Sequence, residues 1–373
     1  MELNADLHIH SCFSMASSPR MLPDPILTGC RVKGISIIGT GDILHPEWRQ
    51  MWEETSVPED MVVIPTTEVE AQGRVHHLIL LPDFESASDL AQALTSSSKN
   101  ISSNGRPQVT MAGETLAQTV HDAGGLIGPA HAFTPWTSLY AAHNSIKSCY
   151  GDEPIDLLEL GLSSDSTYGE RIPDLEKVPF LTNSDAHSPE PGKLGREFTR
   201  FDLPDNNLGT GAVLTAIRKG SITMNAGFFP EEGKYNLTAC TRCFSLFSRE
   251  DAERYRWKCP DDNGRIKKGV RDRAEELSTG KVTQRPPYLH IIPLAEIIQR
   301  TVGTCSPTTK KCQEIYASCI KLWGNEISIL ITTPIDQIRE YSPELGEAIA
   351  AFRDGKVTLH PGGGGKYGTF ELG

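Results

Sequence analysis

The segment Ala5–Ser11 reads ADLHIHS, a short apolar run that carries two histidines, His8 and His10, near its carboxyl end. The same arrangement recurs along the first half of the chain, where other apolar runs adjoin side chains of kinds that bind metals. In a parallel barrel the carboxyl ends of all strands face one side, so residues far apart in the sequence meet there. The segments that repeat the pattern are GISIIGTGD with Asp42 followed by His45, VVIPTTE with Glu68, VHHLILL with His76 and His77, LIGPAH with His131, and PFLTNSDAH with Asp185 and His187.

Apolar runs and helix-like stretches alternate from residue 1 to about residue 225, which is the pattern of β–α units around a parallel sheet. Seven strands are predicted here, more than a simple doubly wound unit needs. We therefore predict an α/β fold in which residues 1–225 form a closed or nearly closed barrel. The predicted strands are 5–9, 34–39, 62–68, 77–81, 125–129, 157–160 and 178–182.

Imidazole and carboxylate side chains suit Zn, Mn and Fe at hydrolytic centres, so their concentration at strand ends predicts a cluster of two or three metal ions. A single HxH motif has many accidental matches. The joint pattern is more specific, because nine of the eleven histidines precede residue 190 and most of them stand at strand ends beside a carboxylate. His76 and His77 compete for one ligand position, and we prefer His77 because it directly precedes LILL.

The motifs DLHIHS, TGD with a following histidine, TTE, PAH and NSDAH resemble, in order and spacing, those of the polymerase and histidinol phosphatase (PHP) family of metal-dependent phosphoesterases. The resemblance covers about residues 1–225 and implies a distorted (β/α)7 barrel. Met15 and Ile43 depart from the family pattern at positions of a third metal site. The resemblance implies one metal held by His8, His10, Glu68 and Asp185, and a second held by Glu68, His77 and His131. It also implies that His187 belongs to this site and that Asp42 and His45 are among the catalytic residues.

The composition is that of an ordinary globular protein of 373 residues. Acidic side chains outnumber basic ones by 48 to 36, which excludes a generally basic, histone-like nucleic-acid binder. No segment approaches the roughly 20 continuous apolar residues of a membrane helix, and the chain begins without a secretory signal pattern. Nine cysteines in such a chain favour free thiols and metal binding over disulfides. We expect a cytoplasmic protein with no membrane partner.

A second module is expected at residues 226–280, where three cysteines lie in an aromatic and charged segment. Cys240 and Cys243 are separated by two residues and Cys259 follows, as in a zinc knuckle. Asp262 stands where a fourth thiolate is expected, so a structural zinc site is either completed by Asp262, weakened or empty. Three buried thiols without zinc are the alternative.

Residues 254–273 carry eight basic and three acidic side chains, the only marked basic patch in the sequence. Interleaved with Tyr255 and Trp257, they suit phosphate contacts and base stacking, and the alternative is an ordinary solvated surface. We predict that this patch binds DNA through Arg254, Arg256, Lys258, Arg265, Lys267, Lys268, Arg271 and Arg273.

Apolar residues at helical spacing predict a mainly helical carboxyl-terminal domain at residues 281–373. The glycine run 362–365 lacks the ending of a phosphate-binding loop and is expected to be a flexible turn. Over nearly the full length, the chain resembles the endonuclease Q family of DNA repair nucleases, which combine a PHP domain, a zinc-binding module and a helical domain. The motifs of this closer match are TGDILHPEW, LELGLSSDS, LGREFTRF, TACTRC, GRIKKGVRDR and HPGGGGKYG.

This resemblance implies hydrolysis, by metal-activated water, of the phosphodiester on the 5′ side of a deaminated base (uracil, hypoxanthine or xanthine) or an abasic site. It implies damaged DNA as the partner, divalent Zn or Mg ions in the barrel, with Mn as an alternative, and a structural Zn at the cysteines. We expect phosphate charge to be neutralised by Arg196 or Lys193, and we look for the base pocket in loops that carry Trp136, Ser164, Asp165 and Tyr168. No clamp-binding motif ends the sequence, so no sliding clamp is predicted.

Two alternatives stay open. A PHP phosphatase that acts on a small phosphomonoester, such as histidinol phosphate, would use the same metal cluster but would leave residues 224–373 without a role. A non-enzymatic module that binds damaged DNA would use the metals only for structure, and retained activity after replacement of Asp185 would favour it.

Overall fold

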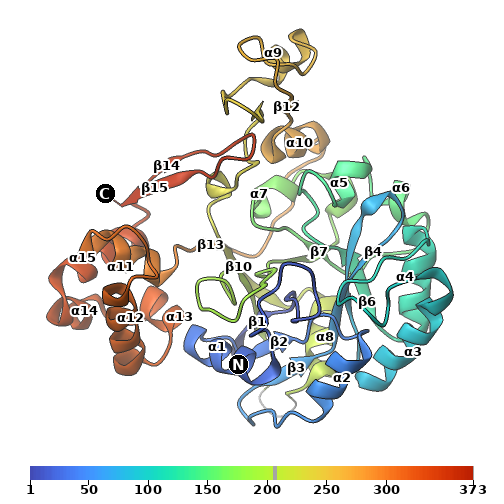
Figure 1. Cartoon of the computed structure of the whole chain (residues 1–373), viewed down its shortest axis with the longest axis horizontal. Helices are drawn as coiled ribbons and strands as arrows, with labels where there is room; N and C mark the ends of the chain where they lie inside the picture. The colour runs from blue at the N-terminus through green and yellow to red at the C-terminus, as the bar shows by residue number, and fades with distance from the viewer. Residues whose placement is uncertain (205–207, 373) are drawn as a thin grey trace.

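The computed structural model describes residues 1–204 and 208–372. It consists of an α/β barrel, a small module that projects from the barrel, and a cluster of helices on the flank (Figure 1). A carboxyl-terminal hairpin runs from the helical cluster toward the base of the projecting module (Figure 1). These three parts meet around one end of the barrel.

Each strand predicted in the barrel region corresponds to an observed strand, and the predicted strand 62–68 is divided into two. Two further strands, β9 (Phe198–Asp202) and β10 (Ile222–Gly227), were not predicted. The others are β1 (Glu2–Asp6), β2 (Ile37–Gly39), β3 (Val62–Ile64), β4 (Thr66–Glu70), β5 (His76–Leu80), β6 (Leu126–Pro129), β7 (Leu158–Glu159) and β8 (Phe180–Leu181).

The expectation of a purely parallel sheet is wrong for half of the barrel. Strands β1, β2 and β3 are parallel, as are β7 and β8. Strand β9, however, pairs antiparallel with β1 and β10, and β4, β5 and β6 form an antiparallel sheet. The barrel is thus built of short sheet segments. It closes through a parallel β-bridge between Ile9, which follows β1, and Ala186, which follows β8. This segmentation is the distortion that a (β/α)7 PHP-type barrel implies.

Alternate strand side chains separate the barrel interior from the outer layer. Ile37 and Leu78 belong to the interior core, whereas their neighbours Ile38 and Ile79 pack in the outer core. Helix α8 (Thr210–Lys219) contributes to the interior core. The other helices of this region are α1 (Pro23–Lys33), α2 (Pro46–Glu53), α3 (Phe84–Leu94), α4 (Gly113–Asp122), α5 (Leu139–Ala142), α6 (Lys147–Tyr150) and α7 (Ser166–Gly169).

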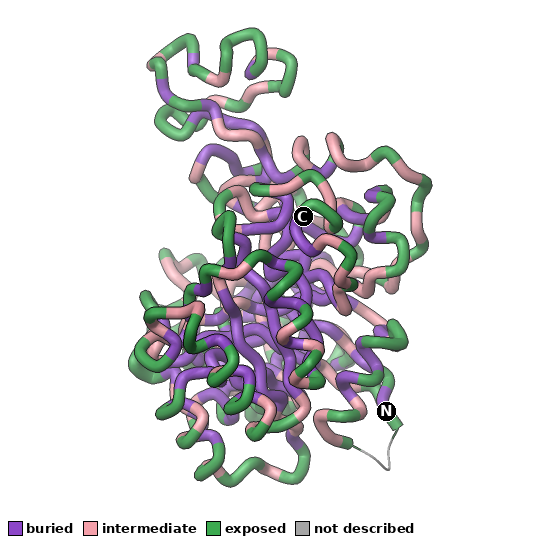
Figure 2. The backbone as a smooth tube through the Cα atoms, turned by 90° about the vertical axis from the view of Figure 1, so that its right-hand side faces the viewer, coloured by how far each residue is buried: buried purple, intermediate pink, exposed green. Residues whose placement is uncertain are grey.

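The projecting module has very little core of its own. Figure 2 shows a mostly exposed chain that stands away from the purple interior of the barrel. Its buried hydrophobic cluster holds only Cys240, Ala252, Cys259 and Ile266. A body of this size needs a metal or a cross-link in addition to its core. Its elements are β11 (Ala239–Cys240), α9 (Arg249–Arg254), β12 (Ile266–Lys267) and α10 (Val270–Leu277).

The last part of the chain is mainly helical, but it begins by extending the barrel sheet. Strand β13 (Tyr288–His290) pairs in parallel with β10 before the first helix of this part starts. The division at about residues 225 and 280 stays a prediction. The remaining elements are α11 (Leu294–Val302), α12 (Lys310–Trp323), α13 (Glu326–Ile331), α14 (Ile335–Tyr341), α15 (Pro343–Arg353), β14 (Val357–His360) and β15 (Thr369–Leu372).

A buried ion pair fastens the helical cluster to the barrel. The ammonium of Lys33 on α1 donates to the carboxylate of Glu326 on α13 at 2.8 Å, and both side chains are 1% exposed. Lys33 also donates to the carbonyl of Pro191, in a loop beside the metal-binding residues. Within the described residues, every helix is too short or too polar to span a bilayer.

Candidate active site

Strand ends bring most of the predicted metal-binding side chains to one end of the barrel. His8 and His10 follow β1, and Asp185 follows β8. Ligand atoms of these three residues all lie within 4.8 Å of one another. A second group that meets the same limit consists of Glu68, His76 and His131. The described part of the chain therefore offers two adjacent sets of three ligands.

Glu68 lies between the two sets. Its Oε1 is 2.8 Å from Nε2 of His131 and 2.6 Å from Nδ1 of His76. Its Oε2 is 3.4 Å from Nε2 of His10, and that nitrogen is in turn 3.1 Å from Oδ1 of Asp185. A carboxylate with one oxygen toward each set is suited to bridge two cations.

The histidines of the first set are oriented by carboxylates behind them. His8 donates from Nδ1 to Glu159 at 2.8 Å, and His10 donates from Nδ1 to Asp42 at 3.1 Å. Both Nε2 atoms are then turned toward the cluster, where they are buried and make no hydrogen bond with the described residues. Metal-binding histidines are commonly held in this way, with the second ring nitrogen bound to a carboxylate. The donor set therefore fits divalent metal ions.

The structure places His76, and not His77, in the cluster. Both precede the same apolar run, but neighbouring side chains of a strand point to opposite faces. On β5, His76 lies opposite Glu70 and shares its face with Glu68. His77 points away and shares a hydrogen bond of 2.7 Å between its Nδ1 and the hydroxyl of Tyr150. Burial lowers the pKa of His77 to about 3, so it stays neutral.

Asp42, His45 and His187 lie at different distances from the two ligand sets. Asp42 orients His10 and also accepts from the backbone and hydroxyl of Ser11. His45 precedes helix α2 and stacks on Phe13 with ring centroids 4.0 Å apart. His187 stacks on His10 at 4.4 Å, and its Nε2 is 3.6 Å from Asp185. Thus Asp42 supports a ligand, His187 lies at the rim, and His45 is absent from both ligand sets.

Negative charge dominates the cluster. Burial alone would lower the pKa of His8, but the carboxylates of Glu159, Asp185 and Glu68 raise it to about 9. Burial opposes ionisation of Asp185 as well, yet its pKa is lowered overall by the close contact with His10 and by nearby histidine charge. Protons on these histidines compensate the charge of the carboxylates. A divalent cation would replace them in that role.

The backbone is strained at three predicted functional residues. Asp42, His131 and Asp185 have φ values of 53°, 30° and 47°, in the left-handed region that residues with a side chain rarely adopt. Such strain persists only where the surrounding structure enforces it, and it is frequent at functional sites. At these three residues the positive φ changes the direction of the backbone just after a strand.

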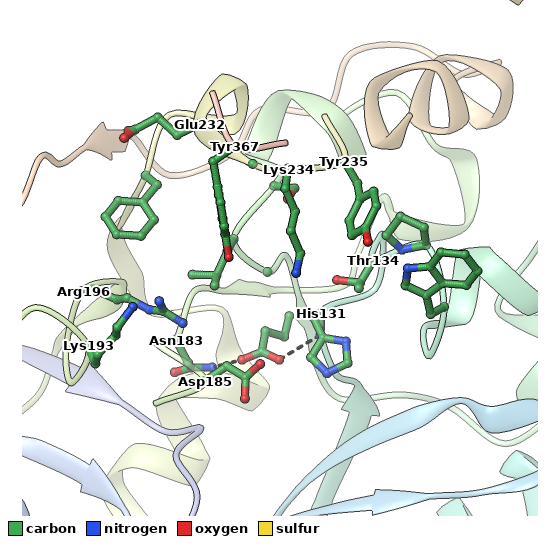
Figure 3. A pocket seen from close by; sticks show the side chains of 18 of the residues that line it. His131, Thr134, Asn183, Asp185, Lys193, Arg196, Glu232, Lys234, Tyr235 and Tyr367 are labelled. Atoms are coloured by element: carbon green, nitrogen blue, oxygen red, sulfur yellow. Dashed lines mark hydrogen bonds between the residues drawn. The ribbon is translucent and has the colours of Figure 1, made fainter. Parts of the chain in front are cut away.

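A cavity of about 620 Å³ opens above the cluster. Figure 3 shows Asp185 and His131 on its floor, Lys193 and Arg196 on one side, and Lys234 and Tyr367 above. Trp136 lines the cavity, as expected for a base pocket. The expected residues Ser164, Asp165 and Tyr168 do not line it and instead form hydrogen bonds with Leu160, His290 and Asn236.

Reasoning about strand ends does not find four residues of this site. Glu159 stands at the end of a predicted strand, so the strand-end rule could have found it. Arg106 donates to Glu68 at 3.1 Å from a serine-rich loop that carries no recognisable motif. Lys234 and Tyr367 come from the second module and the glycine-rich segment, and nothing in the sequence connects them to the barrel.

The projecting module contains a fourfold ligand set. Ligand atoms of Cys240, Cys243, Cys259 and Asp262 lie within 4.8 Å of one another. The Sγ atoms of Cys243 and Cys259 are 3.6 Å apart, and Oδ1 of Asp262 is 3.4 Å from Sγ of Cys240. Asp262 thus occupies the fourth corner of the cluster. Three thiolates and a carboxylate can hold zinc, although a carboxylate is unusual in a structural site.

Solved structures of one enzyme family superpose on the whole chain. The crystal structure of the lesion-specific endonuclease PfuEndoQ from Pyrococcus furiosus has a TM-score of 0.95 and 41% sequence identity, and the match covers 100% of this chain and 96% of that one. The chain belongs to the endonuclease Q family. A structure of endonuclease Q with a 27-mer duplex that carries an abasic lesion at its active site has a TM-score of 0.94 and 41% identity, covering 100% of this chain and 97% of that one.

Sequence relatives of this endonuclease Q family protein include YqxK of Bacillus subtilis, which is 30% identical over 99% of both chains. The protein MJ0043 of Methanocaldococcus jannaschii is 46% identical over 266 residues, which are 69% of this chain and 32% of that protein. The match to MJ0043 thus spans about a third of its length. The family model of the MJ0043 C-terminal domain matches residues 293–356, which contain helices α11 to α15.

The basic segment of this endonuclease Q family member is divided into two groups by the structure. Arg254, Arg256, Lys258 and Arg265 are exposed on the projecting module, and Arg271 is exposed on α10. Lys267, Lys268 and Arg273 are half-buried at the base of the module. Lys267 donates to the carbonyl of Pro135, Lys268 pairs with Glu276, and Arg273 donates to the carbonyls of Tyr140 and His143. Lys267 and Arg273 therefore anchor the module to the barrel, whereas Lys268 forms an ion pair within the module.

Proposed function

We propose that this protein is a metal-dependent DNA repair endonuclease that hydrolyses the phosphodiester on the 5′ side of a damaged nucleotide. One observation carries the proposal. The metal-type ligand cluster forms the floor of a cavity whose walls include the cationic side chains of Arg106, Lys193 and Arg196. A phosphodiester needs both features, because its hydrolysis develops negative charge that fixed cations stabilise.

The roles of the residues follow from their placement. His8, His10 and Asp185 would hold one divalent ion, and Glu68, His76 and His131 a second, with Glu68 shared between them. When bound, these ions would supply Lewis-acid activation of water and of the phosphoryl group. Glu159 and Asp42 orient the histidines, and Arg196 and Lys193 neutralise phosphate charge. Zn or Mg, with Mn as the alternative, matches this mixture of imidazole and carboxylate ligands.

The proposed substrate is a DNA strand that contains uracil, hypoxanthine, xanthine or an abasic site. The cavity supports this choice because it is large enough for a nucleotide extruded from the helix, as enzymes that act on damaged bases require. The exposed arginines of the projecting module would bind the flanking backbone, and a zinc ion held by the four-residue set would keep the module folded. Such a substrate implies a cytoplasmic, nucleoid-associated site of action.

The test uses end-labelled duplexes that are undamaged or carry one deoxyuridine, one deoxyinosine or one abasic site, incubated with Mg²⁺ or Mn²⁺. We expect a nick directly 5′ of the lesion, none on the undamaged duplex, and none with Asp185→Ala. Absence of nicks on every duplex, together with release of phosphate from small phosphomonoesters, would contradict the proposal and favour a phosphatase. Specific binding without cleavage under all metal conditions would favour a DNA-binding module.

A further inference from the structure

The roof of the cavity is not supplied by the barrel strands. Lys234 follows the short helix η4 (Pro230–Glu232), and Tyr367 lies in the connection between β14 and β15. Figure 3 shows the two side chains reaching down together toward the floor that carries Asp185 and His131. Two segments distant from each other in the sequence therefore complete the cavity opposite the metal ligands.

The ammonium of Lys234 lies near two aromatic rings. Its ammonium is 5.5 Å from the ring centroid of Tyr235 and 5.6 Å from that of Tyr367. Among the residues that the structure describes, it forms neither a hydrogen bond nor an ion pair. The two aromatic rings hold the cation in place through their faces. Its three N–H donors are left available to a group inside the cavity.

The glycine run fixes this roof, so the expectation of a flexible turn is wrong. Gly364 has φ of 64°, and a Cβ there would overlap the carbonyl oxygen of Cys240. A Cβ on Gly368 would overlap the carbonyl oxygen of Glu231. The amide of Gly365 donates to the carbonyl of Lys234 at 2.9 Å. Only glycine permits this close packing, and the packing places Tyr367 next to Lys234.

We propose that Lys234 is a specificity residue that donates a hydrogen bond to a carbonyl group of the damaged base. The inference rests on the proposed nuclease function and deepens it. Deamination replaces the exocyclic amino group of cytosine or adenine, a donor, by a carbonyl group, an acceptor. A lysine offers donors and no acceptor, so it favours the deaminated base and opposes the original one. The carbonyl-bearing bases thymine and guanine are kept out of the cavity by their pairing in the duplex, since extrusion costs least at a mismatch.

The placement of neighbouring polar groups agrees with this assignment. Lys193 and Arg196 reach the cavity from the side of Asp185 and lie near the floor, where the phosphate would bind (Figure 3). Glu232, the carboxylate of the roof, points away from the cavity centre (Figure 3). Lys234 is therefore the cation of the roof that is placed to meet the base.

The test compares Lys234→Met with Lys219→Met, which removes the same charge from an exposed position at the end of α8. Single-turnover cleavage is measured on one duplex with deoxyuridine and one with an abasic site. We expect cleavage at deoxyuridine to fall by about tenfold or more relative to the control, because a charge-assisted hydrogen bond to the base is lost. Cleavage at the abasic site should change by less than about threefold, since no base is present.

A Lys234→Gln variant sharpens the result, because its amide can donate to uracil and also accept from cytosine. It should recover part of the cleavage at deoxyuridine and lower the preference for deoxyuridine over a mismatched cytosine. Equal losses on the deoxyuridine and abasic duplexes would overturn the inference in favour of a phosphate contact, and no loss on either would also overturn it. A wild-type protein that cuts neither duplex would instead refute the proposed function and this inference together.

Discussion

The two metal-type sites of this protein are built in opposite ways. The barrel site lies at strand ends of a large, buried core. The carboxylates of Glu159 and Asp42 hold its histidines His8 and His10 in place. The cysteine site lies in a projecting module with a core of four buried residues (Figure 2). The first is a site that the fold makes for a metal, and we propose that the second is a fold that depends on a bound metal. Loss of a ligand should therefore abolish chemistry in one and structure in the other.

The largest effect is expected for Asp185→Asn. The amide keeps the shape of the carboxylate but removes its charge beside His10 and His8. Outer partners of metal ligands commonly contribute about 10- to 100-fold, so the loss of a ligand should reduce the cleavage rate by more than about 100-fold. Cleavage rates and melting temperatures are compared with those of Asp122→Asn, an exposed position on α4. An unchanged rate would show that Asp185 holds no catalytic metal.

The second prediction concerns Cys259→Ser in the projecting module. Removing one of four ligands from a body with so small a core should release one equivalent of zinc and unfold the module locally. We expect proteolysis within residues 240–268 and weaker DNA binding by about tenfold, with the melting transition of the barrel retained. Zinc per chain, proteolytic fragments and DNA affinity are measured beside Cys305→Ser, an exposed cysteine outside the module. A module that lacks zinc but resists proteolysis would show that its fold does not depend on a metal, which contradicts the proposed difference between the two sites.

The third prediction uses a buried carboxyl of the barrel. Glu197 is fully buried, accepts from the amide of Phe228 at 3.0 Å, and has its pKa raised by burial to about 8. In the unfolded chain the same group titrates near 4.5. Between these values the folded protein binds a proton that the unfolded chain does not, so the free energy of unfolding falls as pH rises.

Glu197→Gln should flatten this decline between about pH 5 and about pH 8, because the amide cannot ionise. Urea midpoints are measured across that range beside Glu53→Gln, an exposed position on α2. A decline as steep as in the wild type would assign the pH dependence to other groups. In the projecting module, Asp262 shows the opposite behaviour, since hydrogen bonding by Gly264 lowers its pKa. The two regions thus also differ in how they shift the pKa of a carboxyl group, which is raised for Glu197 in the barrel and lowered for Asp262 in the module.

Strand-end reasoning recovered the barrel because most of the ligands stand at the end of an apolar run whose length and composition predict a strand. The structure brings five of the residues that this reasoning named, His8, His10, Glu68, His131 and Asp185, together at one end of the barrel. The same reasoning preferred His77, whereas the structure groups His76 with Glu68 and His131, because that choice depends on the register of β5 against β4. One residue of register exchanges the two faces of a strand. No local pattern in the sequence determines that register.

The roof of the cavity was beyond the reach of sequence reasoning for a different reason. Lys234 and Tyr367 are 133 residues apart and meet only because the glycine run packs against residues 231–240. Glycine repeats predict permissive backbone, and permissive backbone serves either a flexible turn or close packing. A glycine run in the sequence is compatible with a flexible turn and with close packing. Only the atoms that surround each glycine in the folded protein distinguish the two.

The smallest effect is expected for single exposed arginines of the module, and it tests whether the two halves of the basic segment differ. Arg256 is exposed, whereas Arg273 donates to carbonyls of the barrel. Arg256→Gln should weaken DNA binding a few-fold and reduce the slope of log affinity against log salt by about one, as the loss of one phosphate contact does. Arg273→Gln should leave the slope closer to wild type but lower the melting temperature, since it loosens the base of the module. Equal slopes for both variants would mean that Arg273 also contacts DNA. The DNA-binding surface would then continue from the projecting module onto its base beside the barrel.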